Sequence, residues 1–173
     1  MKNKNLVRIM TKKSWQPKKF RFDGWFGILI TLGNWMDGIF NSYCHTELDF
    51  MDGTSFSAFE GGGRTDPKTG RTCSVGFKDI EYSHPERWEA ITIDVTDPRL
   101  PRRWKSKAAL RLECVRLSGR DYDVLGCIGQ AIGIDSLQDD KKDFCSEVVG
   151  GMFGVFRMSP ARLYNKLKEI FND

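Results

Sequence analysis

Two residue types that together can carry out nucleophilic chemistry stand about 100 positions apart in this chain. Cys145 lies in the segment DFCSEVVGGMFGV, residues 143–155, where we expect a helix to begin. Asp143 is the predicted N-cap, because a short carboxylate can accept the unpaired amide hydrogens of the first turn. His45 lies in the alternating stretch SYCHTELDF. The positive end of a helix dipole favours a thiolate, so the two residues predict a cysteine nucleophile with a histidine as its base.

The stretch around His45 predicts a strand that presents a carboxylate beside the imidazole. Residues 41–50 and 54–60 have the pattern of two strands, joined by the turn sequence Asp52-Gly53. Side chains alternate between the faces of a strand, so four residues are expected to share one face: Tyr43, His45, Glu47 and Asp49. Residues two apart on a strand lie about 6.5–7 Å apart, so Glu47 reaches His45 only through the length of its side chain.

The cysteines favour a reducing compartment. They are odd in number and form no CxxC pair: Cys44, Cys73, Cys114, Cys127 and Cys145. This pattern argues against a disulfide framework and a zinc ribbon. The two histidines, far apart and without a ligand spacing, do not support a metal site, and no dinucleotide or phosphate-binding fingerprint occurs. We therefore expect neither a metal nor a cofactor.

Basic side chains are concentrated at the N-terminus. The chain of 173 residues has 27 Lys and Arg against 23 Asp and Glu, a net charge of +4. Residues 1–22 contain eight basic side chains and no acidic one, so the rest of the chain is acidic overall. This distribution predicts a basic N-terminal arm over 1–22 and one domain over 23–173. Such an arm suits an anionic polymer or a partner protein.

The predicted elements favour an α+β fold. Strands are expected over 72–77 and 89–95, after the hairpin, and helices over 106–117 and 123–133. The Cys145 helix follows, and a last helix over 159–171 opens with Ser159 as N-cap and Pro160 at its first position. Because strands come first and helices after, we expect an antiparallel sheet packed against helices.

The residue segments resemble, in order, a known enzyme group. The segments are YCHTELDFMDGTSFSAFEGGGR, ERWEAITIDV, GRDYDVLGCIGQAIG and FCSEVVGGMFGV followed by a Ser-Pro helix. They are similar to circularly permuted papain-like cysteine hydrolases, related to the NlpC/P60 superfamily and including YiiX-like proteins, and above all to small members carried by bacteriophages. The resemblance runs from about residue 42 to 168. It implies a permuted papain-like fold with the histidine on an early strand and the cysteine on a late helix.

The resemblance assigns Cys145 as nucleophile and His45 as general base. It implies a thiol amidase or peptidase that attacks an amide or ester carbonyl through an acyl-thioester intermediate. A third, polar side chain that orients the imidazole is also expected. Glu47 and Ser57 rank equally for this role, and Glu60 follows. Ser57 precedes a small residue on the next strand, as the family pattern requires, although a serine orients an imidazole weakly.

The implied substrate is a peptide or acyl compound, with the peptide cross-links of bacterial peptidoglycan as the natural class for a phage protein. No apolar run reaches the roughly 18–20 residues that span a bilayer, and residues 1–22 lack the features of a signal peptide. We therefore expect a cytoplasmic or virion-associated protein. Two alternatives are a non-catalytic virion or tail component on the same scaffold, and a cytosolic effector that docks through the basic arm.

Four further residues invite a functional interpretation. We expect His84, beside a proline, to be an exposed loop residue. Trp88 and Trp104 are expected to be core or interface anchors. Tyr122 is a candidate to line the cleft, because its segment precedes the cysteine helix.

Overall fold

The computed structural model describes residues 4–16, 21–22, 28, 30–32, 35, 43–59, 64–65, 72–80, 82, 84–123, 125–127, 129 and 142–171. Its strands are β1 (Leu6–Lys13), β2 (Trp15–Gln16), β3 (Arg21–Phe22), β4 (Tyr43–Asp49), β5 (Thr54–Ala58), β6 (Arg64–Thr65), β7 (Thr72–Cys73), β8 (Val75–Asp79), β9 (Trp88–Asp94), β10 (Asp121–Tyr122) and β11 (Lys142–Asp143). Its helices are the 3-10 turn η1 (Pro85–Arg87), α2 (Lys107–Leu117), α4 (Cys145–Met152) and α5 (Pro160–Phe171).

Five strands form one antiparallel sheet in the order β8-β5-β4-β1-β9. The predicted hairpin is present as β4 and β5. Gly53, in the turn between them, has a φ of 93°, a left-handed conformation that glycine adopts without steric cost. Because β4 is the middle strand, its side chains lie at the centre of both faces of the sheet.

β1 lies inside the sheet, between β4 and β9. It pairs with both neighbours, so its backbone is hydrogen-bonded on both sides. Val7 and Ile9 are fully buried in the core, while alternation places Arg8 and Lys12 on the other face. Residues 6–13 are therefore part of the domain, which corrects the prediction of a separate arm over 1–22. The same residues that carry the positive charge also carry an apolar alternation, with Val7 and Ile9 on the buried face.

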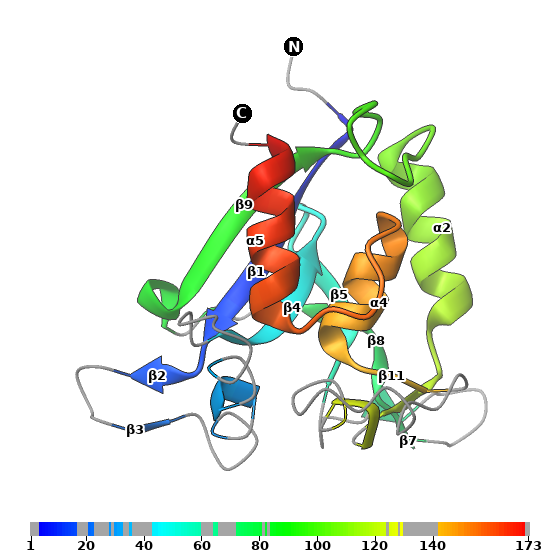
Figure 1. The fold of residues 1–173 in the computed structure, drawn as a ribbon. Coiled ribbons are helices and arrows are strands. Elements are labelled where there is room, and N and C mark those ends of the chain that lie inside the picture. The colour runs from blue at the N-terminus through cyan, green and yellow to red at the C-terminus, as the bar shows by residue number, and fades with distance from the viewer. Residues whose placement is uncertain are drawn as a thin grey trace.

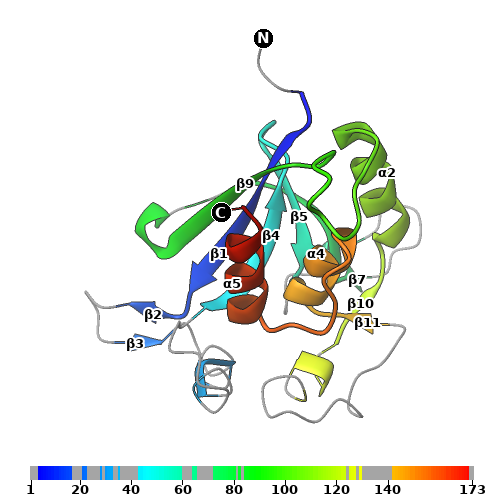
Figure 2. The ribbon, with the colours of Figure 1, turned by 45° about the horizontal axis from the view of Figure 1, so that its top comes forward.

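The helices pack on the apolar face of this sheet. α4 contacts β4 and β5, α5 contacts β1, β4 and β9, and α2 lies beside β8. Figures 1 and 2 both show α4 and α5 across the same face, with α2 next to α4. The largest fully buried side chains of this core include Ile9, Leu48, Phe56, Ile93, Leu110, Phe153, Leu163 and Leu167. The predicted class, an antiparallel sheet packed against helices, is confirmed.

Some helix predictions are tested only in part. The last predicted helix begins at Pro160, and the Ser159 hydroxyl accepts from the Arg162 amide at 3.4 Å. Within 123–133, residues 125–127 and 129 are helical, Asp123 is not part of a helix, and the other residues lie outside the described part of the chain. None of the helices in the described part of the chain combines the length and apolar character needed to cross a membrane.

Candidate active site

A β-bulge in β4 precedes His45. Lys12 and Lys13 of β1 pair with His45 and Tyr43, so the register of the ladder passes over Cys44, whose thiol donates to the Lys12 carbonyl at 3.7 Å. A bulge breaks the alternation of a strand and redirects the side chains around it. Tyr43 packs against Tyr164 of α5, with ring centroids 4.8 Å apart, on the helix side of the sheet. The prediction that Tyr43 shares a face with His45 is therefore wrong, because it assumed an unbroken period of two.

His45 is enclosed by a carboxylate and two aromatic rings. Its Nε2 lies 3.1 Å from Oε1 of Glu47. Its ring centroid lies 5.6 Å from that of Phe59 and 6.2 Å from that of Trp88, which presents an edge-on contact. The His45 side chain is 20 % exposed, so one part of the imidazole still meets solvent.

Cys145 is the first residue of α4 and is fully buried. The N-cap is Phe144, with extended backbone and no side-chain capping bond. Asp143, the predicted N-cap, stands one residue too early. It belongs to β11, which pairs in parallel with β10, and its carboxylate lies 2.9 Å from Arg120 Nη1. The strand pairing sets where the helix starts and overrides the capping preference of Asp143.

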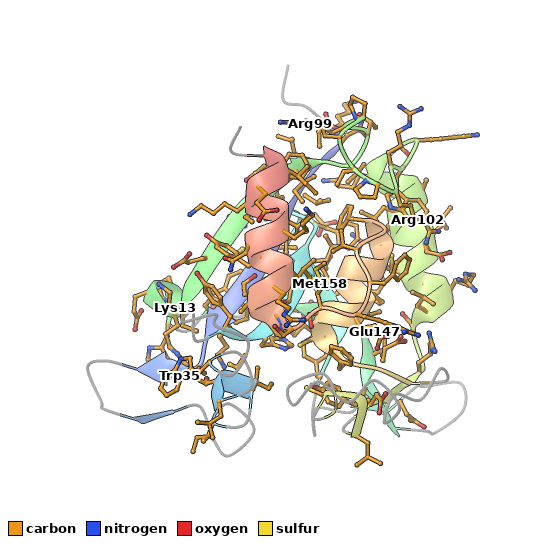
Figure 3. All side chains as sticks on the ribbon, viewed as in Figure 1. Lys13, Trp35, Arg99, Arg102, Glu147 and Met158 are labelled. Atoms are coloured by element: carbon orange, nitrogen blue, oxygen red, sulfur yellow. The ribbon has the colours of Figure 1, made fainter. Side chains whose placement is uncertain are left out.

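Glu147 supplies the cap that Phe144 lacks. Its carboxylate accepts from the backbone N–H of Phe144, one half of a capping box. Burial raises the pKa of Glu147, the charges of Asp143 and Asp123 add to the effect, and the pKa reaches about 7. Figure 3 shows Glu147 on the side of α4 nearest β11. The first turn of α4 is thus capped by a carboxylate whose pKa lies near neutral pH.

The structure brings His45 and Cys145 together. Burial of the imidazole favours its neutral form, but the negative charge of the nearby Cys145 side chain and the contact with Glu47 outweigh burial and raise the pKa of His45 to about 9. Because Nε2 contacts Glu47, we expect Nδ1 to be the ring nitrogen that serves the thiol. A thiolate beside an imidazolium is the activated form of a cysteine nucleophile.

Glu47 is a fully buried carboxylate with three donors. Oε1 accepts from His45 and, at 2.5 Å, from Lys78 Nζ, while Oε2 accepts from Ser55 Oγ at 2.8 Å. Burial disfavours the charge, but the hydrogen bond from His45 and the charges of His45 and Lys78 lower the pKa of Glu47 to about 2. The site therefore holds Glu47 ionised and oriented toward the imidazole.

Ser57, the other candidate for orienting the imidazole, is engaged elsewhere. Its hydroxyl donates to the Thr46 carbonyl at 2.5 Å, with a longer contact of 3.4 Å to the Ala58 carbonyl. These bonds tie β5 to β4 where their ladder ends. Glu60 lies outside the described residues. Of the candidates for the third position, Glu47 is the one that the structure shows in contact with His45.

Sequence patterns missed Ser55, Lys78 and Phe59. Ser55 pairs with Asp49 across the hairpin and with Lys78 on β8. Ser55, Asp49 and Lys78 therefore lie on the same face of the sheet as Glu47. Extending the hairpin register from the Asp52-Gly53 turn identifies Ser55 as a neighbour of this face. Lys78 carries no local signal, because its place depends on how β8 pairs.

The other residues singled out from the sequence lie in varied places. His84 is exposed, as expected, with Nδ1 3.5 Å from a Glu86 oxygen. Trp104 packs against the core and donates from Nε1 to the Met152 carbonyl at 2.7 Å. Tyr122 is half-buried, and its hydroxyl lies 3.9 Å from Cys127 Sγ. Among the described residues, no group of three His, Cys, Asp or Glu has the arrangement of a metal site.

Three comparisons with known proteins, by family model, by sequence and by structure, find no match. No family model matches the sequence. No curated protein and no solved structure matches the chain significantly. The resemblance to permuted papain-like hydrolases therefore stays a prediction that rests on the quoted residues.

Proposed function

We propose that this protein is a cysteine hydrolase of the permuted papain-like type, an amidase or peptidase with Cys145 as nucleophile, His45 as general base and Glu47 as the residue that orients His45. The observation that carries the proposal is that Cys145 lies close enough to His45 for its charge to raise the pKa of the imidazole, while Nε2 of the same ring contacts Glu47 at 3.1 Å. A nucleophile, a base and a group that orients the base make up the minimal set for acyl transfer.

The first half of the reaction forms a thioester. The Cys145 thiolate attacks the substrate carbonyl carbon, and the C=O electron pair moves to the oxygen. The His45 imidazolium then donates its Nδ1 proton to the leaving amine or alcohol as the carbonyl re-forms and the C–N or C–O bond breaks. Glu47 keeps the imidazole ring in the orientation that allows this transfer.

The second half releases the acid. Neutral His45 takes a proton from water, and the hydroxide oxygen attacks the thioester carbonyl. The C–S bond breaks, and the thiolate and the imidazolium return to their first state. Amide groups in the first turn of α4, including that of Cys145, have no acceptor within the helix and suit the oxyanion of both tetrahedral intermediates.

Peptides are the substrate class that we propose, with bacterial cell-wall cross-links as the leading example and acyl esters as the nearest variant. The choice rests on the resemblance to phage-carried hydrolases, because a scaffold by itself says little about its substrate. A contact of the basic N-terminal residues with an anionic wall polymer belongs to the same proposal.

The full burial of Cys145 favours one alternative, a structural or interaction protein that keeps the scaffold without using it, such as a virion or tail component. A buried thiol reacts only after local opening. Catalysis therefore requires the residues around Cys145 to move when substrate binds.

The deciding measurement is the pH dependence of Cys145 alkylation by iodoacetamide, followed by mass spectrometry in wild type and His45→Ala. Cys114 is a matched internal control: it is also fully buried, on α2, and burial raises its pKa well above the usual range. We expect Cys145 to react below the ordinary thiol pKa of about 8.5 and to lose this reactivity in His45→Ala. Equal rates at Cys145 and Cys114, or indifference to His45, would favour the structural alternative.

A further inference from the structure

The polar face of the sheet carries two buried carboxylates on β4, each paired with a cation from another strand. Glu47 pairs with Lys78 of β8, and Asp49 lies 2.5 Å from Arg8 Nη2 of β1. Both carboxylates are fully buried. A buried charge is tolerated when a counter-charge and hydrogen bonds replace its water. The two pairs are alike in chemistry, but only the first touches His45.

Lys78 and His45 both contact the same carboxylate oxygen of Glu47. Oε1 receives both Lys78 Nζ at 2.5 Å and His45 Nε2 at 3.1 Å. Lys78 and the imidazole therefore bind the same oxygen of the carboxylate, while the other oxygen binds Ser55. With Cys145 as thiolate, the four side chains Cys145, His45, Glu47 and Lys78 alternate in charge and sum to zero.

Lys78 has a second contact that leads back to the imidazole. Its Nζ lies 4.5 Å from the centroid of the Phe59 ring, and Phe59 is the aromatic neighbour whose centroid is 5.6 Å from that of His45. The Lys78 side chain is 30 % exposed, so it closes the polar face over Glu47. Loss of Lys78 would free both the carboxylate and the ring that border His45.

We propose that Lys78 is a positioning residue of the active site, which binds the Glu47 carboxylate and keeps it ionised so that the proton of the Cys145–His45 pair stays on the imidazole. The role rests on the proposed function. It is electrostatic: a carboxylate that already binds an ammonium is a poor proton acceptor, so the His45 proton remains for the leaving group.

Other ionisable groups face the same region, and their charge must stay the same when the variants of Lys78 are compared. Lys12 of β1 lies opposite His45 and over the Trp88 ring, at 5.9 Å from its centroid. Asp49 is held by Arg8. Burial and the nearby charges of Glu47 and Asp49 raise the pKa of Tyr82, so this phenol stays neutral through the working range.

The test is a set of variants read by the pH profile of Cys145 alkylation. Lys78→Met keeps the aliphatic stem and removes the charge, Lys78→Arg keeps the charge, and Arg8→Met removes the equivalent cation from Asp49. We expect Lys78→Met to raise the apparent pKa of alkylation by about one unit, so that the rate at low pH falls about tenfold. Lys78→Arg should restore the wild-type profile, and Arg8→Met should leave it unchanged.

A double variant separates positioning from folding. If Lys78 acts through Glu47, adding Lys78→Met to Glu47→Gln should change the alkylation rate by less than about twofold. This double variant has no unpaired buried carboxylate, so it tests the role even if Lys78→Met alone does not fold. A further large loss in the double variant, a wild-type profile in folded Lys78→Met, or an equal shift in Arg8→Met would overturn the role of Lys78.

Failure of this role is distinguishable from failure of the proposed function. If His45→Ala removes the reactivity of Cys145 while folded Lys78→Met keeps it, the Cys-His pair stands and Lys78 is structural. If His45→Ala has no effect, the proposed function itself fails and the role of Lys78 fails with it.

Discussion

His45 and Glu47, two residues apart on β4, are joined by a hydrogen bond of 3.1 Å between Nε2 and Oε1 that runs along the strand. The backbone separation of such residues is about 6.5–7 Å, so the two long side chains must lean toward each other to close the gap. Lys78 donates to the same carboxylate oxygen, and Ser55 donates to the other one. The orientation of the imidazole is thus decided by residues of three strands.

Glu47→Gln should weaken the nucleophile without removing it. The amide keeps the shape of the side chain but loses the negative charge that stabilises the His45 imidazolium. We expect Cys145 alkylation near pH 6 to fall about tenfold, one unit in apparent pKa. Rates measured by mass spectrometry at several pH values check this shift, and an unchanged profile would remove Glu47 from the site.

Ser57→Ala is the matched control for that experiment. It lies on the strand next to Glu47 and its hydroxyl donates to the Thr46 carbonyl, not to His45. We expect the alkylation profile to stay that of the wild type, while the free energy of unfolding falls by about 1 kcal/mol for the lost hydrogen bond. A shift in the profile as large as that of Glu47→Gln would restore Ser57 as a candidate for the third position.

The His45 imidazole should titrate near pH 9. Burial lowers its pKa, but the charges of Cys145 and Glu47 raise it by more. Because the folded pKa lies above the unfolded value of about 6.5, the stabilisation is complete below that value and is lost as the pH rises through 9. With His84→Gln as background, a single imidazole resonance remains for an NMR titration. A midpoint near 6.5 would contradict the pairing, and Cys145→Ala should lower the midpoint.

Glu147→Gln should stabilise the protein at alkaline pH. Burial, with Asp143 and Asp123, raises the pKa of Glu147 from 4.5 to about 7, so the folded state binds more protons than the unfolded state between these values. Stability therefore falls as the pH rises through this window, and glutamine removes the loss. We expect a gain on the order of 1–2 kcal/mol at about pH 8 and little change near pH 4 in urea unfolding. An equal difference at both pH values would contradict this assignment.

Gly150 and Gly151 of α4 form a matched pair for the packing of the nucleophile helix. A Cβ at Gly150 would lie 2.3 Å from the Val155 carbonyl oxygen, a backbone atom that cannot move aside cheaply, whereas one at Gly151 would lie 3.5 Å from the Phe156 ring. We expect Gly150→Ala to destabilise the fold by roughly 2 kcal/mol or more. Gly151→Ala should be neutral or stabilise by up to about 1 kcal/mol through helix propensity. Thermal unfolding of the two variants checks the difference, and equal melting temperatures would contradict it.

Local patterns in the sequence predicted the parts of the site that depend on near neighbours. The alternation of residues 43–49 placed His45 beside Glu47, and the Asp52-Gly53 turn predicted the hairpin of β4 and β5. The residues around Cys145 predicted a helix with the thiol in its first turn. Such features follow from periodicity and turn preference within a few residues, so they can be derived without the fold.

Long-range pairing decided the rest. β1 entered the sheet because Val7 and Ile9 gain burial against the helices, although the charges of the same segment predicted an arm. The bulge at Cys44 and the start of α4 after β11 depend on which strands pair and in which register. Lys78 reached Glu47 because β8 pairs with β5, about 30 residues from β4 in sequence. By itself, the sequence determined the strand that carries His45 and the helix that carries Cys145. The tertiary structure brought the two residues together and supplied the Lys78 cation at Glu47, because only the assembled sheet fixes which distant side chains share a face.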